Sequence, residues 1–192
     1  MRHVPRYANG FTPRLNPQDL GRQFKKDGLV FVGSMGDMFG DWVGPCWIEC
    51  VLEIIELHKN TTFLFCTKNP ARYFDFLEIM PQNVILGATI ETNRSTELIS
   101  KAPPLVTRMA SMSHIIGWDK MVSIEPIMKF DHEVMVDWIK AVRPLRVYVG
   151  YDNYPQRNHL DEPTLEETEA LIAELGKFTT VYRKTIRKAH DE

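Results

Sequence analysis

Six short apolar runs, rich in β-branched and aromatic residues, recur along this 192-residue chain and constrain its fold more than any other feature. Each run is separated from the next by a segment with helical periodicity, which is typical of βα units with parallel strands. The runs are nearly continuous rather than alternating in polarity, as expected of strands that helices cover. The predicted strands span residues 29–37, 63–68, 84–92, 121–126, 146–153 and 180–184.

A series of right-handed βα crossovers leaves two architectures, an open doubly wound sheet or a partial TIM-type barrel. The chain contains no G-x-G-x-x-G fingerprint of a dinucleotide-binding sheet, and each predicted helix returns to the next strand along. We therefore predict an α/β fold: a partial TIM-type (β/α) barrel of about six parallel strands with flanking helices, forming a single domain over residues 1–192. The series opens with a helix after Asn16-Pro17, so we expect the first strand of the barrel to be missing.

The helical segments between the strands carry recognisable starts and apolar stripes. A helix after Asn69-Pro70 is predicted to bury Phe74, and one after Pro104 is predicted to bury Val106. The last long helix is predicted to begin at Pro163, with the residue at 161 or 162 as its cap. Residues 1–15 are interpreted as an extended arm, and the charged residues 185–192 as a tail that frays.

Composition excludes several classes of protein. A net charge of −2 and an isoelectric point near 6.3 give no overall basic field of the kind that nucleic-acid binders usually show, although the balanced total is compatible with a local basic patch. No apolar run is long enough to span a membrane, and no secretory signal is present, so we expect no membrane partner. Three cysteines, Cys46, Cys50 and Cys66, are too few and too oddly numbered for a disulfide framework, which favours a cytoplasmic location. Their spacing predicts buried, inert thiols rather than a metal site.

Ligands of parallel α/β folds bind where the strands end, and polar residues follow each apolar run here. Glu91 and Glu125 come directly after their strands, so each carboxylate needs a partner such as Lys68, Lys184 or a ligand cation. Glu91, Glu125 and Lys68 are the predicted catalytic residues. The polar residues predicted to bind a cofactor are Gly33, Ser34, Gly36, Asp37, Thr67, Thr89 and Ser123. The alternative interpretation is that strands simply end where polar loops begin, and that the two glycines form an ordinary tight turn.

Four segments, VFVGSMGDMFGDWV, TFLFCTKNPARY, NVILGATIETN and MVSIEPIM, resemble in this order a phage-associated, radical-SAM-like family of unknown function that is distantly similar to spore photoproduct lyase. The resemblance runs from Arg6 to Lys184. It implies a partial (β/α) barrel with a Cys-x-x-x-Cys-x-x-Cys loop around a [4Fe–4S] cluster and S-adenosylmethionine across the strand ends. It also implies that residues 33–37 hold the methionyl amine and that Glu91 and Glu125 line the same cavity.

The chain departs from this family pattern because the three-cysteine loop is absent from its 192 residues. The loop is expected upstream of Arg6, so either the reading frame begins late or this relative has lost its cluster, and a [4Fe–4S] cluster is expected only if an upstream cysteine motif exists. A missing first strand would also leave the strand at Leu29 as an open edge, through which we expect a homodimer. Two alternatives stay open. One is a non-catalytic binding module for a nucleotide-like ligand or nucleic acid, and the other is a cluster-independent barrel enzyme that uses the strand-end carboxylates.

Overall fold

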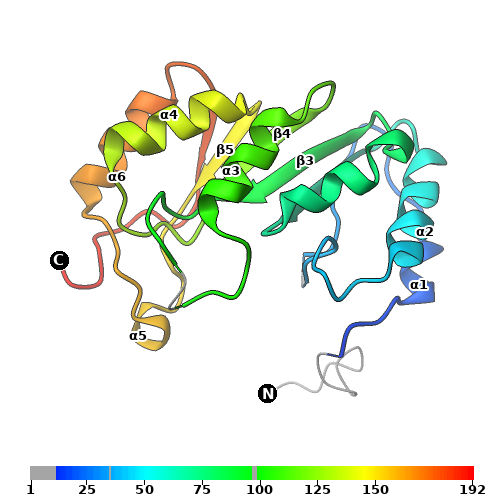
Figure 1. Ribbon diagram of the computed structural model, residues 1–192, viewed down its shortest axis with the longest axis horizontal. Helices are drawn as coiled ribbons and strands as arrows, with labels where there is room; N and C mark the ends of the chain where they lie inside the picture. The colour runs from blue at the N-terminus through cyan, green and yellow to red at the C-terminus, as the bar shows by residue number, and fades with distance from the viewer. Residues whose placement is uncertain (1–11, 35, 97–98) are drawn as a thin grey trace.

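The computed structural model describes residues 12–34, 36–96 and 99–192, so most of the predicted arm lies outside the described residues. Six strands form one all-parallel sheet in the order β1 to β6, curled into part of a barrel with helices around it (Figure 1). This confirms the predicted α/β half-barrel. The strands are β1 (Leu29–Phe31), β2 (Thr62–Thr67), β3 (Val84–Thr89), β4 (Asp119–Ile124), β5 (Arg146–Val149) and β6 (Thr180–Arg183).

The helices pack on the outer side of the curled sheet, where α3, α4 and α6 lie side by side in Figure 1. Among the helices of the described ranges, none is long and apolar enough to cross a membrane. They are α1 (Pro17–Leu20), α2 (Pro45–Glu56), the 3₁₀ helices η2 (Pro70–Asp75) and η3 (Leu77–Ile79), α3 (Leu105–His114), α4 (His132–Val142), α5 (Pro155–Asn158) and α6 (Leu165–Leu175).

The two faces of the sheet differ because successive side chains of a strand point to opposite sides. The outer face and the helices share the main core, to which β2 contributes Phe63 and Phe65. The inner face carries a separate small cluster of Leu64, Ile85 and Met121. No helix of the described residues covers this inner, concave face, so it remains the natural place for a ligand.

The edge position of β1 agrees with the sequence prediction. Within the described residues β1 pairs only with β2, and the side chains of Leu29 and Phe31 are each 50% exposed. The strands themselves are shorter than predicted at their carboxyl ends, because the glycine and polar residues there form turns and loops instead of continuing the ladder.

Two predicted helix faces are wrong in detail. Val106 is 55% exposed, and α3 instead buries Leu105, Arg108 and Met112. Phe74 is 44% exposed because its segment is a 3₁₀ helix, in which residues three apart lie on the same side. In both cases the periodicity predicts a helix correctly but leaves the rotation of the helix about its own axis undetermined.

The start of the last helix also differs from the prediction. Thr164, not residue 161 or 162, caps α6, and it forms a reciprocal capping box with Glu167. Glu162 is instead buried and accepts two hydrogen bonds from Arg187, at 2.7 and 2.8 Å. The backbone N–H of His190 donates to the same carboxylate at 2.9 Å. The tail, predicted to fray, is instead held against the body by this buried acid and by the packing of Ile186 and Ala189 on the core.

Candidate functional site

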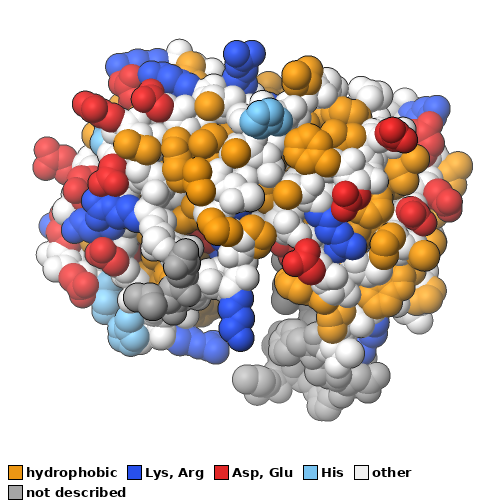
Figure 2. Space-filling model, in the orientation of Figure 1, with side chains coloured by type: hydrophobic (Ala, Val, Ile, Leu, Met, Phe, Trp, Pro, Cys, Tyr) orange, Lys and Arg blue, Asp and Glu red, His pale blue; other side chains and the backbone are white. Residues whose placement is uncertain are grey.

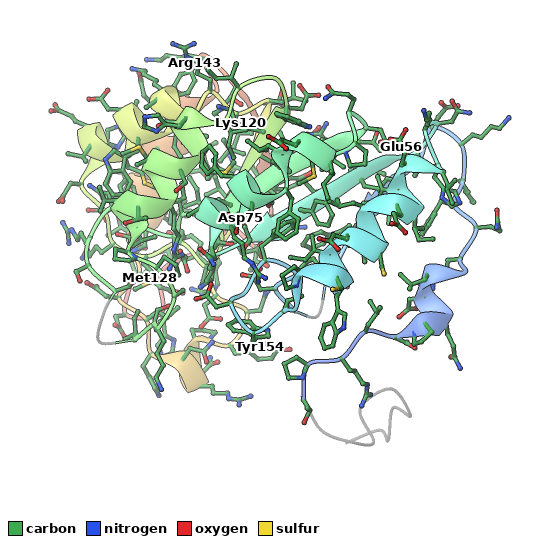
Figure 3. The ribbon with its side chains drawn as sticks, turned by 45° about the vertical axis from the view of Figure 1, so that its right-hand side comes forward. Glu56, Asp75, Lys120, Met128, Arg143 and Tyr154 are labelled. Atoms are coloured by element: carbon green, nitrogen blue, oxygen red, sulfur yellow. The ribbon has the colours of Figure 1, made fainter. Side chains whose placement is uncertain are left out.

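The carboxyl ends of the strands gather at one end of the half-barrel. Figure 3 labels Lys120 and Arg143 at the end where β4 and β5 begin, and Met128 and Tyr154 at the opposite end, beyond where they finish. In the space-filling view the lower edge of the molecule, toward which β3 points in Figure 1, is hollowed (Figure 2). Some of the predicted site residues lie around this mouth, and others do not.

A cluster of three charges, two of them buried, lies at the ends of β2 and β3. The carboxylate of Glu91, which is 4% exposed, accepts from the Lys68 ammonium group through one oxygen and from Arg108 Nη1 through the other, at 2.9 Å. The structure thus brings together two of the three predicted catalytic residues. Because both oxygens of Glu91 face a cation, this acid is neutralised within the protein and is a poor candidate for a free general base.

Arg108 is the residue that sequence reasoning missed in this cluster. Its side chain is fully buried. Nε donates to the Pro103 carbonyl at 2.7 Å and Nη1 donates to the Thr89 carbonyl at 3.0 Å, so the side chain connects α3 to the end of β3. Its remaining nitrogen, Nη2, is buried and has no hydrogen-bond partner among the described residues. An arginine on an apolar helix stripe is the signal that could have found it, because a charge in that place requires a buried partner.

The turn after β1 is joined to the same cluster through Asp37. One carboxylate oxygen of Asp37 accepts from the backbone N–H of Phe39 at 3.0 Å and the other from that of Lys68 at 2.9 Å. Gly33 adopts a φ of +72°, which glycine alone allows readily, and its carbonyl accepts from Gly36 N. The turn is therefore built into the end of β2 rather than free in solvent.

The other predicted residues of this turn face a different cavity. Gly33, Ser34 and Gly36 line a pocket of about 470 Å³ that runs along the open edge of β1, between the segment 12–24 and α2. Its wall is largely apolar and includes Trp42 and Trp47. Asp37 lines this pocket as well and reaches Lys68, so it stands between the edge pocket and the mouth of the barrel.

Besides Ser34, three predicted site residues carry a hydroxyl, and two of these lie on the concave face. Thr89 and Ser123 are register partners on β3 and β4, and the Thr89 hydroxyl lies 3.5 Å from the thiol of Cys66 on β2. Thr67 has the opposite orientation. It is buried, and its hydroxyl accepts from the Asn69 N–H at 2.8 Å, so it shapes the loop after β2 instead of lining the face.

Glu125 is the carboxylate at this mouth that the protein leaves uncompensated. It follows β4, is half-buried, and has no hydrogen bond or ion pair within the described part of the chain. Its Oε1 lies against Gly150 at the end of β5, where an added Cβ would come within 3.3 Å of it and within 2.8 Å of the Lys184 Cβ. Lys184 therefore lies beside the same glycine, although no ion pair joins the two side chains in the described residues. A side chain at position 150 would crowd this carboxylate, whereas the glycine leaves it accessible from the concave face.

Cys66 of β2 lies half-buried on the concave face, and burial of its thiol sets its chemistry. Burial raises the pKa of the Cys66 thiol to about 11, although the Thr89 hydroxyl opposes the shift. The thiolate is the reactive form, so the protonated Cys66 is a weak nucleophile and metal ligand at neutral pH. Since the raised pKa belongs to the folded state, the associated stabilisation is present below the unfolded value of 9.0 and is lost as the pH rises toward 11.

This difference predicts selective alkylation. At pH 8 iodoacetamide is expected to modify exposed Cys46 much faster than half-buried Cys66, because the raised pKa of Cys66, about 11 against 9.0, lowers its thiolate fraction roughly 100-fold. Peptide mass spectrometry of the native protein over time measures both rates, and the unfolded protein should show similar rates at both sites. Equal rates in the native protein would contradict the buried, protonated Cys66.

The three cysteines do not converge. Cys46 and Cys50 lie on α2, outside the sheet, whereas Cys66 lies on the inner face of β2. The prediction of buried thiols is wrong for Cys46, which is exposed, and Cys50 and Cys66 are only half-buried. Within residues 12–34, 36–96 and 99–192, no group of three or more His, Cys, Asp or Glu side chains is placed to hold a metal ion. The described residues therefore do not fit a [4Fe–4S] cluster.

Two aromatic residues on the concave face are not among the predicted site residues. Tyr148 of β5 and Tyr182 of β6 are register partners, and their rings stack with centroids 5.0 Å apart and an interplanar angle of 20°. Both tyrosines lie close to the ends of their strands, and alternation along a strand places them on the same face as the polar strand-end residues. This position is the signal in the sequence that could have identified them as site residues.

Comparison with known proteins adds a family but no activity. No curated protein and no solved structure matches the chain. A family model described as protein of unknown function (DUF5131) matches residues 9–142, which is well over half of the sequence and includes the turn at Asp37, the Lys68–Glu91–Arg108 cluster and Glu125. The chain therefore belongs to the DUF5131 family of proteins of unknown function.

Proposed function

We propose that this domain binds S-adenosylmethionine on the concave face of the half-barrel, as a member of a radical-SAM-like group of enzymes whose substrate is not established. The observation that carries the proposal is the uncompensated carboxylate of Glu125 at the end of β4, beside the strand-end hydroxyls of Ser123 and Thr89. S-adenosylmethionine carries an ammonium and a sulfonium charge, and a half-buried carboxylate without a partner favours such a ligand.

The neighbouring charges support this choice of acid. Glu91 is already paired with Lys68 and Arg108, and both oxygens of Asp37 accept backbone N–H groups. Neither acid has a free oxygen without rearrangement of its present partners. Glu125 can accept a ligand cation at no cost in existing hydrogen bonds, so it orients the ligand while the Glu91 cluster fixes the ends of β2 and β3.

The residues fit S-adenosylmethionine better than they fit the cluster that a radical enzyme also needs. The cofactor would supply a cleavable sulfonium group, and this chain would supply Glu125, Ser123 and Thr89 as its polar contacts. Since the described cysteines do not converge, the described residues support no chemical step through a cluster. Binding of the cofactor is the part of the proposed function that this chain can perform alone.

Isothermal titration calorimetry with S-adenosylmethionine tests the proposal. The wild-type chain is expected to bind saturably, and to bind S-adenosylhomocysteine more weakly because that compound lacks the sulfonium charge. Glu125→Gln is expected to weaken binding by about tenfold or more, as expected for loss of a hydrogen bond to a charged group, which contributes roughly 1.5–3 kcal/mol.

Glu169→Gln is the matched control. Glu169 is a partly exposed acid that pairs with Arg183 on the outer side of the sheet, so its removal should leave the affinity unchanged. Absence of saturable heat with the wild type, or equal affinities of Glu125→Gln and the wild type, would refute the proposed site.

A further inference from the structure

We propose that the β5–β6 side of the concave face is a binding surface for single-stranded nucleic acid, with Tyr182 as its base-stacking residue. This surface adjoins the proposed cofactor site, because Lys184 and Glu125 both lie beside Gly150, but the binding proposed here does not depend on S-adenosylmethionine. The surface consists of two aromatic rings and two cations on adjacent strands, each placed by the register of the sheet.

The aromatic pair provides a preformed stacking surface. Tyr148 covers one face of the Tyr182 ring, and β6 is the last strand of the sheet among the described residues, so the other face of the ring lies on the side without a neighbouring strand. Tyr182 is 44% exposed although its outer neighbour, Val181, packs into the main core. An exposed aromatic ring held flat by a second ring is the surface on which nucleobases stack without regard to sequence.

Two cations flank the rings on the same face. Arg146 precedes Tyr148 by two residues and Lys184 follows Tyr182 by two, so alternation along the strands places all four side chains on one face. The Lys184 ammonium group lies 5.7 Å from the centroid of the Tyr148 ring. Neither Arg146 nor Lys184 forms an ion pair with a carboxylate in the described ranges, in contrast to Arg183, which pairs with Glu169 on the outer face.

Charge and shape together indicate the class of ligand. Two unpaired cations along the edges of an aromatic pair suit a chain of phosphates that carries planar bases. A duplex keeps its bases stacked on one another and would present only its backbone, so the exposed ring favours a single strand. DNA and RNA share this chemistry, and their comparison belongs to the test.

Fluorescence anisotropy with fluorescein-labelled dodecamers of thymidine DNA and uridine RNA, without S-adenosylmethionine, provides that test. The wild type is expected to bind at least one of the two single strands saturably, and more tightly than a duplex dodecamer. Tyr182→Ala should weaken binding by about 5- to 100-fold, the range expected for loss of one stacked base. Tyr182→Phe should bind like the wild type, because stacking does not need the hydroxyl.

The salt dependence tests the cations separately. Lys184→Gln is expected to lower the slope of log affinity against log salt concentration by about 0.7, the contribution of one phosphate contact to a single strand. The pair Phe178 and Lys140 is the matched control. The Phe178 ring is 39% exposed and its centroid lies 5.6 Å from the Lys140 ammonium group, but Phe178 precedes β6 and is not part of the proposed surface. Phe178→Ala and Lys140→Gln should change neither affinity nor slope.

Three results would overturn the inference: no binding of either single strand by the wild type, equal binding by a folded Tyr182→Ala variant, or a preference for duplex. If the melting curve shows that Tyr182→Ala is unfolded, the salt dependence decides instead. A slope of log affinity against log salt concentration for Lys184→Gln equal to that of the wild type would then overturn the inference. Because the oligonucleotide titration contains no S-adenosylmethionine, its failure leaves the calorimetric result untouched, and failure of cofactor binding leaves this result untouched.

Discussion

Replacement of Arg108 by leucine is expected to destabilise the protein by about 3–5 kcal/mol, the range for removal of one partner from a buried ion pair. Arg108 is fully buried, and its loss would leave one oxygen of the buried Glu91 carboxylate without its cation. The carbonyl groups of Pro103 and Thr89 would lose their donors as well. Lys68 cannot replace it, because its side chain is 41% exposed and reaches the opposite oxygen.

Urea unfolding followed by circular dichroism measures this effect, provided that the transitions are two-state with equal slopes. Arg183→Leu is the control, since Arg183 pairs with Glu169 while both side chains are well exposed, and such pairs contribute roughly 0–1 kcal/mol. The double variant Arg108→Leu/Glu91→Leu should recover part of the loss, because it removes the buried charge that the single variant leaves unpaired. A loss in Arg108→Leu no larger than that in Arg183→Leu would contradict the assignment of a buried ion pair.

The Arg108 cluster also illustrates which parts of the fold the sequence can predict. Apolar runs separated by helical periodicity are local signals, and they place all six strands and the half-barrel correctly. The helix that carries Arg108 is also predicted, but its inward face is not. Residues 105, 108 and 112 and residues 106, 109 and 112 both follow helical spacing, and a charged residue is ordinarily assigned to solvent.

The candidate site divides in the same way. Strand-end positions identify Lys68, Glu91, Glu125, Thr89 and Ser123, because parallel strands converge at their carboxyl ends whatever their order. What the sequence cannot supply is the partner of each acid, which depends on contacts between residues far apart in the chain. Glu91 and Glu125 look equivalent in sequence, yet one is paired with two cations and the other is left without a partner among the described residues.

The tail makes the same point at a larger separation. The charged and polar residues after β6 carry no apolar periodicity, so local reasoning predicts fraying. Their anchor is the buried Glu162, which lies 25 residues before Arg187 in the chain. The segment also packs Ile186 and Ala189 against the core, and Arg187 donates to the Asp152 carbonyl at 2.9 Å. These contacts join residues far apart in the chain, so local reasoning does not find them.

Gly87 in the middle of β3 is the second position where a single change should have a large effect. An added Cβ would lie 2.4 Å from the carbonyl oxygen of Phe65 and 2.9 Å from Cε of Met121. The Met121 side chain can rotate away, but the carbonyl belongs to the neighbouring strand and cannot move without distorting the pairing of β2 with β3. Gly87→Ala is therefore expected to destabilise the protein by about 1–3 kcal/mol, the usual cost of overpacking.

The double variant Gly87→Ala/Met121→Ala identifies which contact matters. If the carbonyl dominates, the two losses in free energy of unfolding add within about 0.5 kcal/mol; if the methionine dominates, the double variant is more stable than the sum of the singles predicts. We expect additivity, because the carbonyl is both nearer and less mobile. Gly21→Ala is the control, since nothing lies within 4 Å of its added Cβ. Near-equal stability of Gly87→Ala and Gly21→Ala would mean that the sheet can open at β3 without loss, and the concave face could not then be a rigid platform for a ligand.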